Sequence, residues 1–278
     1  MTESLVIADE LLVGRKTTIV HFYNTLLGRD PYAEELEYYY KSSEPLDRVY
    51  LCIKSTHYDS VIRNNAKLPI SAVILAKNAE ESMEMCLNSV SSFVSEIVVL
   101  EDASSTDATA EISKAFGARV YTAGFSGFGN MRTLNAHLAR QPWVLQIDTD
   151  EILCKEEIPL IETLVQDEAV DIWGLPRRRW LDLEMNTQIE VEAYPDWQYR
   201  LFRNDIKIRF ERRVHERIVG SDNIKTSEKG PHLEHYQDVF KTGDKLRERN
   251  KMYKELYSLD VKEGIKYDCP AVVDMDDI

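Results

Sequence analysis

"ISAVILAKNAEESMEMCLNSV", residues 70–90, joins a strand pattern directly to a helix pattern. Residues 70–76 form a short, continuous apolar run, which is typical of a strand buried on both faces of a parallel sheet. Asn78 can cap the helix that follows, and Met83, Leu87 and Val90 lie on one face of it. The stretch therefore predicts one strand followed by one helix.

The same unit recurs along the chain. Further strands are predicted at 96–100, 118–123 and 143–147, with helices at 104–117 and 130–140 between them. Strands and helices that alternate in this way form an α/β fold, a mostly parallel sheet flanked by helices. Ligands of such sheets bind beyond the carboxyl ends of the strands.

The flanking segments have a different character. Residues 1–66 predict a small all-α N-terminal domain, in which Ile19, Phe22, Tyr23 and Leu26 recur at helical spacing. The α/β domain is expected over 67–260, with mixed strand-like segments after residue 171, a polar-faced helix at 238–259, and an acidic tail at 261–278. For the N-terminal module we expect an interaction with a protein or a glycan.

Composition excludes several classes of function. The 278 residues include 34 Lys and Arg against 48 Asp and Glu, a formal net charge of -14, which argues against nucleic acid as a partner. Apolar runs such as "AVILA" (72–76) are far shorter than the roughly 20 residues of a transmembrane segment. The four cysteines form no CxxC pair, so neither a zinc site nor a disulfide framework is predicted. We expect a cytoplasmic location, with attachment to the membrane face left open.

Acidic residues follow two of the predicted strands. Asp102 comes after the second strand, and "WVLQIDTDEIL" (143–153) places Asp148 and Asp150 after the fourth. Where the strand ends in a turn, both carboxylates can converge on one divalent cation. The alternative is an ordinary strand-to-turn junction, in which aspartates make local hydrogen bonds.

Four motifs follow one another along the chain: "ISAVILAKNAEESMEMCLNSV", "EIVVLEDASSTDAT", "GFGNMRTLNAHLA" and "WVLQIDTDEIL". Together they resemble the family 2 glycosyltransferases of GT-A fold, and among these the branch of the lipopolysaccharide-core glucosyltransferases. The first 66 residues resemble a small helical module of bacterial surface and glycosylation proteins. The resemblance implies an inverting enzyme that uses Mn²⁺ or Mg²⁺ to move a sugar from a nucleotide-sugar donor, commonly a UDP-sugar, to a hydroxyl of a glycan-type acceptor.

The resemblance also implies roles for residues near the donor. Asp150 matches the family's metal ligand, and Asp148 matches the acid that contacts the ribose or the metal shell. Asp102 matches the acid that binds the nucleobase. The remaining candidates for the nucleotide cleft and the phosphates are Ala76, Lys77, Arg132, Arg200 and Arg203.

The catalytic base is expected in "YPDWQYR", because an inverting transfer needs a group that takes the proton of the acceptor. Asp196 is the preferred candidate, with Glu192 behind it and Glu190 and Asp182 as alternatives. Trp197 and Tyr199 suit stacking on the acceptor sugar. His215 and His235 are candidates for an imidazole in the metal shell, although each can equally be structural.

Three other functions are alternatives for such a sequence. An aspartate-nucleophile phosphatase needs its DxDx(T/V) motif after the first strand, whereas "DTDEI" follows the fourth and ends in Ile152. A sugar nucleotidylyltransferase needs a glycine-rich basic loop where this chain has "AKNAEE". The non-enzyme alternative is a degenerate GT-A protein that binds a nucleotide-sugar or a glycan without turnover.

Overall fold

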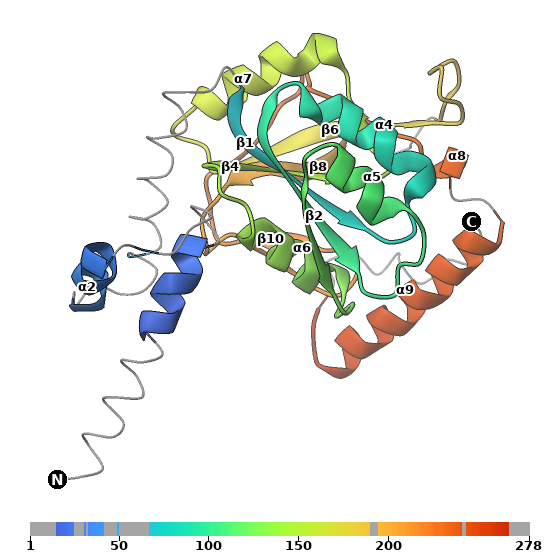
Figure 1. Ribbon diagram of the computed structural model, residues 1–278. Coiled ribbons are helices and arrows are strands. Elements are labelled where there is room, and N and C mark those ends of the chain that lie inside the picture. Colours follow the sequence, from blue (N-terminus) through green and yellow to red (C-terminus); the bar gives the residue numbers. More distant parts are fainter. Residues whose placement is uncertain are drawn as a thin grey trace.

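Strand β1 (Leu68–Ala76) lies inside a sheet, between β2 (Val94–Asp102) and β4 (Trp143–Asp148), and pairs in parallel with both. Strand β3 (Arg119–Ala123) adds to the outer side of β2, also in parallel. These are the four predicted strands, in the order β3-β2-β1-β4. The computed structural model describes residues 15–24, 31, 33–41, 49, 67–189, 194–240 and 243–266 (Figure 1).

Beyond β4 the sheet becomes mixed. Its order continues as β8 (Asp196–Arg203), β6 (Ile172–Trp180), β12 (Leu233–His235) and β5 (Glu151–Leu153). Strand β8 runs antiparallel to both β4 and β6, which confirms the predicted change of pattern after residue 171. The short strands β7 (Gln188–Ile189) and β11 (Ile224–Thr226) pair with β6, and β9 (Arg209–Glu211) forms a separate pair with β10 (Arg217–Val219).

Helices cover both faces of the parallel strands. Residues at alternate positions of a strand point to opposite faces, so Ile74 of β1 joins the core under α4 (Glu80–Ser91) and α7 (Ile158–Gln166), while Val73 faces the other side. On that other side lie α6 (Phe128–His137) and the β9 and β10 pair. The remaining helices are α5 (Thr109–Ala115), the 3₁₀ turn η1 (Lys155–Glu157), α8 (Gln237–Phe240) and α9 (Asp244–Lys262).

The cap predicted for the first of these helices is wrong in detail. Helix α4 begins at Glu80, after Ala79, and Asn78 has a left-handed backbone with φ of 44°. Its side-chain oxygen instead accepts a hydrogen bond of 2.8 Å from the amide of Thr106. Asn78 therefore ties the loop after β1 to the loop after β2, because the two parallel strands end side by side.

Two helices lie in the N-terminal region, where helices are predicted, and they pack together. Residues 15–24 and α2 (Ala33–Lys41) meet in a small cluster around Ile19, Tyr23 and Val49, which also contacts Ile206 of the α/β domain. Leu26 and the rest of the predicted module lie outside the described residues.

The division into domains at 1–66 and 67–260 stays a prediction, and one element lies near each of its bounds. Strand β1 begins at Leu68, next to the boundary predicted at 66. At the other end, α9 continues to Lys262, so the boundary predicted at 260 falls inside a helix; the tail beyond residue 266 lies outside the described residues. Within the described part of the chain, no helix has the length and apolar composition needed to cross a membrane.

Candidate functional site

The predicted acidic residues meet at one edge of the sheet. Asp148 ends β4 and is level with Leu75 of β1, while Asp102 ends β2 on the other side of β1. The two carboxyl-bearing strands are thus about 10 Å apart, since neighbouring strands are about 4.8 Å apart. This is the edge at which open α/β sheets bind their ligands.

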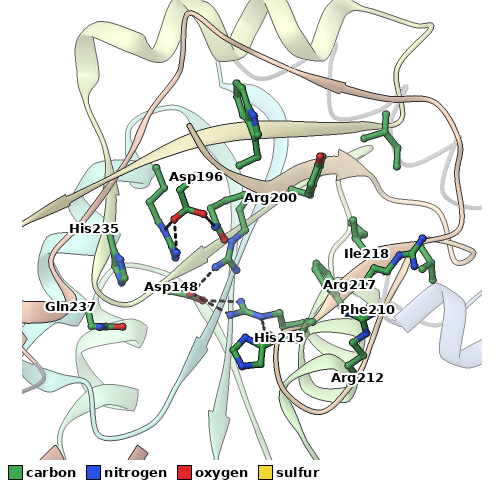
Figure 2. A pocket seen from close by; sticks show the side chains of 18 of the residues that line it. Asp148, Asp196, Arg200, Phe210, Arg212, His215, Arg217, Ile218, His235 and Gln237 are labelled. Atoms are coloured by element: carbon green, nitrogen blue, oxygen red, sulfur yellow. Dashed lines mark hydrogen bonds and ion pairs between the residues drawn. The ribbon is translucent and has the colours of Figure 1, made fainter. Parts of the chain in front are cut away.

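A cavity of about 1200 Å³ opens beyond β4 and β8 (Figure 2). Its lining is rich in charge, with seven arginines and five carboxylates in a chain whose formal net charge is -14. Arginine is the side chain best suited to bind phosphate oxygens in pairs. The arginines are Arg132, Arg177, Arg179, Arg200, Arg212, Arg217 and Arg249, and the acids are Asp148, Asp150, Asp196, Glu216 and Asp222.

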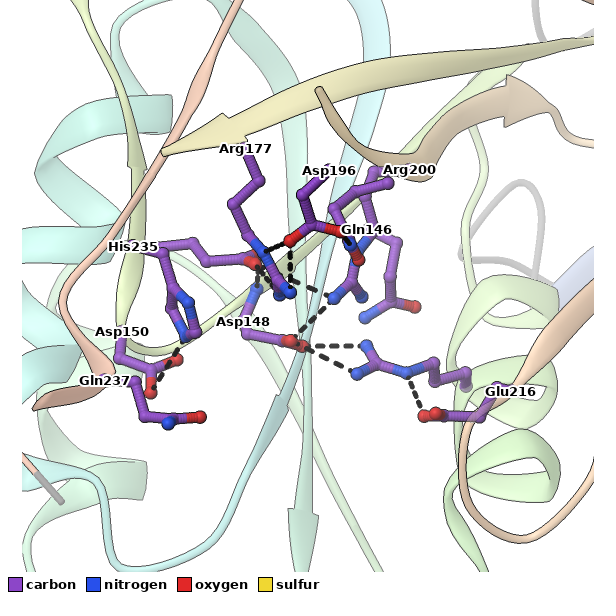
Figure 3. A network of polar contacts seen from close by, with 12 residues as sticks. Gln146, Asp148, Asp150, Arg177, Asp196, Arg200, Glu216, His235 and Gln237 are labelled. Atoms are coloured by element: carbon purple, nitrogen blue, oxygen red, sulfur yellow. Dashed lines mark hydrogen bonds and ion pairs between the residues drawn. The ribbon is translucent and has the colours of Figure 1, made fainter. Parts of the chain in front are cut away.

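Asp148 lies between two of these guanidinium groups (Figure 3). Arg132 donates from Nη1 to Oδ1 at 2.7 Å and from Nη2 to Oδ2 at 3.2 Å, and Arg200 donates from Nη2 to Oδ2 at 2.8 Å. The Nε atom of Arg132 donates to Glu216 at 2.7 Å. Burial by itself would lower the pKa of Arg132, but the charges of Asp148 and Glu216 outweigh it and raise that pKa well above its ordinary value.

Asp196 is held by Arg177. The Nε and Nη2 atoms of Arg177 lie 2.8 and 2.7 Å from its Oδ2 atom. Glu151 supports this group, because it is fully buried, accepts a hydrogen bond from the amide of Asp148 at 3.1 Å and lies 3.4 Å from Arg177 Nη1. Glu151 is thus a supporting residue, as its buried place after β4 suggests.

Asp150 faces His235, whose strand β12 runs beside β5. Asp150 Oδ2 and His235 Nε2 are 3.7 Å apart, and both side chains are buried. The Nδ1 atom of His235 is also buried and has no hydrogen-bond partner. A carboxylate oxygen and an imidazole nitrogen are ligands that Mn²⁺ accepts. The described residues contain no group of three or more His, Cys, Asp or Glu side chains that could hold a metal ion, so a cation here would need ligands from the substrate.

A second polar corner lies beside the cavity, at the ends of β1 and β2. Asp102 accepts hydrogen bonds from the amide and hydroxyl of Ser104 at 2.8 and 2.7 Å, and Lys77 Nζ is 3.6 Å from its other oxygen. Burial raises the pKa of Asp102, but these hydrogen bonds and the Lys77 charge more than compensate, so the net shift is downward. Ala76, Lys77 and Asp102 are thus brought together, although they do not line the cavity itself.

The loop that carries His215 and Glu216 rests on the start of α6. The amides of Phe128 and Gly129 donate to the carbonyl oxygens of Arg213 and Arg212 at 2.8 and 3.1 Å. A side chain at position 129 would overlap the Arg212 carbonyl, so glycine is required for this contact. The "GFGN" motif therefore brings the loop to Arg132 of the same helix.

The two candidate histidines have different surroundings. His235 reaches Asp150, whereas the ring of His215 packs edge-on against Tyr253 of α9 with centroids 5.9 Å apart. His215 also has a left-handed backbone, with φ of 50°. Burial lowers its pKa below the ordinary 6.5. Of the two, His235 has the surroundings that suit a metal ligand.

The other predicted site residues lie on β8 or in the segment that leads to it. Trp197 and Tyr199 line the cavity, and their acceptor role stays a prediction. Arg203 does not line the cavity, because its guanidinium stacks on the Trp143 ring at 4.1 Å. Trp143 starts β4 and Asp148 ends it, so Arg203 lies at the opposite edge of the sheet from Asp148. The predicted contact of Arg203 with phosphate is therefore wrong. Asp182 accepts the amides of Asn186 and Thr187 in a hairpin turn away from the cavity, which removes it as a base. Glu192 and Glu190 lie outside the described residues.

Several cavity residues were not predicted. Arg177 belongs to the run "PRRRW", and Glu216 directly follows His215 in "VHE". Arg249 and Tyr253 come from α9, which the sequence indicated only as a polar-faced helix. A run of arginines on a strand next to acidic motifs was the available signal for Arg177, whereas α9 gave none.

Comparison with known proteins accords with this geometry. The family model described as "Glycosyl transferase family 2" matches residues 71–220, just over half of the chain. An uncharacterised glycosyltransferase of Rickettsia felis is 37% identical over 119 residues, which are 43% of this chain and 42% of that protein. The lipopolysaccharide core biosynthesis glycosyltransferase LpsC of Rhizobium meliloti is 29% identical over 190 residues, 66% of this chain and 68% of its own.

The chain spans less than half the length of the Rickettsia relatives that it matches. An uncharacterised glycosyltransferase of Rickettsia bellii, 33% identical over 102 residues, is matched over 37% of this chain and only 34% of its own length. Among solved structures, residues 1–349 of S. aureus TarS in complex with UDP-GlcNAc superpose with a TM-score of 0.52 at 15% identity, covering 73% of this chain and 68% of that one. At that identity the similarity establishes the fold alone.

Proposed function

Because the chain belongs to glycosyl transferase family 2, we propose that it transfers a sugar from a UDP-sugar to a hydroxyl group of a glycan-type acceptor, with inversion and with a divalent cation. The observation that carries this proposal is the common edge of the sheet, where Asp102, Asp148 and Asp150 lie beside an arginine-rich cavity. LpsC is named for lipopolysaccharide core biosynthesis, which supports a glycan as the acceptor class.

The donor is proposed to span from β2 to β8. Asp102, with Ala76 and Lys77 beside it, would take the nucleobase, since its carboxylate is already oriented by Ser104. Arg132 and Arg200 would take the diphosphate through charge-assisted hydrogen bonds. The cavity volume of about 1200 Å³ leaves room for donor sugar and acceptor together.

Asp150 and His235 would hold the divalent cation, Mn²⁺ or Mg²⁺, with the donor's phosphate oxygens as further ligands. When bound, this cation neutralises charge on the leaving diphosphate. The protein's own arginines act in the same direction, because guanidinium groups in a buried site stabilise developing negative charge.

Asp196 is the proposed base. In the transfer, the acceptor oxygen forms a bond to the anomeric carbon as the bond from that carbon to the diphosphate oxygen breaks, and UDP leaves with the bonding electrons. The acceptor proton passes to the Asp196 carboxylate. Its hydrogen bonds to Arg177 and Gln198 fix the carboxylate at the cavity wall, next to Trp197 on the same strand.

A panel of nucleotide-sugars tests the function. Each donor is added to the full chain with Mg²⁺ or Mn²⁺, and the thermal shift and the rate of donor hydrolysis are measured. We expect one UDP-sugar to raise the melting temperature and to be hydrolysed in a metal-dependent way. Binding without hydrolysis or transfer to any acceptor would favour the degenerate binding module instead, and failure of every nucleotide-sugar to bind would refute both functions.

A further inference from the structure

Asp148 makes contacts that a metal ligand does not need. Both of its oxygens accept hydrogen bonds from guanidinium groups, Oδ1 from Arg132 and Oδ2 from Arg132 and Arg200. The paired contact with Arg132 fixes the plane of that guanidinium, because two parallel N–H donors meet two oxygens. Asp148 therefore orients two guanidinium groups in the lining of the cavity.

Glu216 completes the arrangement. It accepts from Arg132 Nε at 2.7 Å, from the opposite side to Asp148. Arg132 and Arg200 are both more than nine-tenths buried, so neither can swing freely into solvent. A guanidinium has more N–H donors than these contacts use, which leaves N–H groups on both arginines for an anion.

The same contacts disfavour Asp148 as a ligand of a metal cation. Two positive guanidinium groups at hydrogen-bond distance repel a divalent ion at this carboxylate. Asp150 lies near a different kind of group, the imidazole of His235, whose Nε2 atom is 3.7 Å from its Oδ2 atom. The two acids of the "DTD" motif thus contact different groups: Asp148 contacts two guanidinium groups, and Asp150 lies near an imidazole.

We propose that Asp148 and Glu216 are positioning residues that hold Arg132 and Arg200 as a clamp for the donor's diphosphate, and that this clamp binds the diphosphate without the divalent cation. The inference rests on the proposed function, since it assumes a nucleoside diphosphate sugar as the donor. It assigns the two neighbouring acids different tasks: Asp150 serves the cation, and Asp148 serves the arginines.

Calorimetric titration of the full chain tests the clamp directly. UDP and uridine are each titrated into the protein in the presence of EDTA, and UDP is then titrated in the presence of Mn²⁺. The difference between UDP and uridine gives the contribution of the diphosphate to affinity without metal, and the two UDP titrations give the effect of the metal. In EDTA we expect UDP to bind at least about tenfold more tightly than uridine, because charge-assisted hydrogen bonds to phosphate do not require the ion. Equal binding of UDP and uridine in EDTA would overturn the clamp.

Variants separate positioning from other roles. Asp148→Asn and Glu216→Gln should each weaken UDP binding in EDTA by about tenfold and leave uridine binding unchanged, because only the orientation of the arginines is lost. Arg132→Lys should do the same, since a lysine keeps the charge but not the paired geometry. Asp150→Ala should instead lose the gain in affinity that Mn²⁺ provides.

Asp238→Asn is the matched control. Asp238 pairs with Arg179, another arginine of the cavity, at 2.9 Å, so the substitution removes a carboxylate from an arginine outside the clamp. We expect wild-type binding of UDP in EDTA. The clamp is refuted if folded Glu216→Gln and Asp148→Asn bind UDP in EDTA like the wild type, or if Asp148→Asn loses the Mn²⁺ gain as Asp150→Ala does. Donor turnover by the same wild-type sample tests the proposed function separately, and it can persist when the clamp fails.

Discussion

Asp150 Oδ2 and His235 Nε2 lie 3.7 Å apart, and both side chains are almost completely buried where β12 passes the end of β4. The two residues are far apart in sequence and meet only in the folded chain. In the proposed site this pair would give the cation a nitrogen and an oxygen ligand from the protein, and the substrate would supply others.

His235→Gln should raise the Mn²⁺ concentration for half-maximal donor hydrolysis by about tenfold or more, because one ligand is removed. The control is His232→Gln on the same segment, whose ring pairs with Glu157 at 2.7 Å and should not affect the metal. Unchanged Mn²⁺ dependence in the His235 variant would contradict the assignment.

Asp150→Ala should abolish donor turnover and leave the fold intact. The loss follows because the proposed cation would keep only one ligand from the protein. Hydrolysis rates together with circular dichroism measure both parts of this prediction. Turnover at the wild-type rate would rule Asp150 out as a metal ligand.

Asp196→Asn should lower the rate of transfer by about a hundredfold or more, because the amide cannot take the acceptor proton. UDP should still bind, and calorimetry can check this. Asp182→Asn serves as the control, since Asp182 lies in a hairpin turn outside the cavity, and its activity should be normal. If Asp196→Asn fails to fold, the pair with Arg177 is structural and the base must be sought elsewhere.

His215 should make stability depend on pH. Burial keeps its pKa in the folded chain below the ordinary 6.5, so the unfolded chain binds more protons in the window beneath that value. Stability is therefore present above pH 6.5 and decreases as the pH falls toward the folded pKa. His215→Asn, which tolerates the left-handed backbone, should lose less stability than the wild type between about pH 7.5 and 5.5. Urea unfolding at both values measures the difference, and equal losses in the two proteins would refute it.

Gly129→Ala should destabilise the chain by about 1–3 kcal/mol, because the new methyl group overlaps the carbonyl of Arg212 and must push the loop away. Activity should fall as well, since Glu216 on that loop holds Arg132. Gly124→Ala is the control, because its added carbon meets nothing within 4 Å. Denaturant unfolding and donor hydrolysis give the two readouts, and similar behaviour of both variants would contradict the role of the loop.

The parallel half of the fold could be predicted because each unit has its own local pattern. The apolar run at 70–76 is long enough to indicate a strand, and the apolar residues after it recur at the period of a helix, so both can be recognised without tertiary contacts. The second half could not, because strands such as β12 have only three residues and take their place from partners distant in sequence. Local propensity does not encode such pairings.

The site was predictable where a motif carried it. Asp102, Asp148 and Asp150 lie where their strand ends placed them, whereas the contacts between them and the arginines depend on tertiary packing. The prediction for Arg203 was wrong for two reasons. Arg203 is three residues from Arg200, and an odd separation on a strand places two side chains on opposite faces of the sheet. Arg203 also pairs with Trp143, at the edge of the sheet away from Asp148. The role of the N-terminal module stays a prediction.

The N-terminal helices are joined to the α/β domain at the edge of the sheet opposite to Asp148. Arg140, just before β4, donates to the carbonyl oxygen of Asn24 at 3.1 Å, and Ile206, just after β8, touches the cluster around Ile19. Asp148 lies at the far end of β4. An enzyme immobilised on a support through these helices would hence turn the edge of the sheet with Asp148 toward the bulk phase, where large acceptors could reach it.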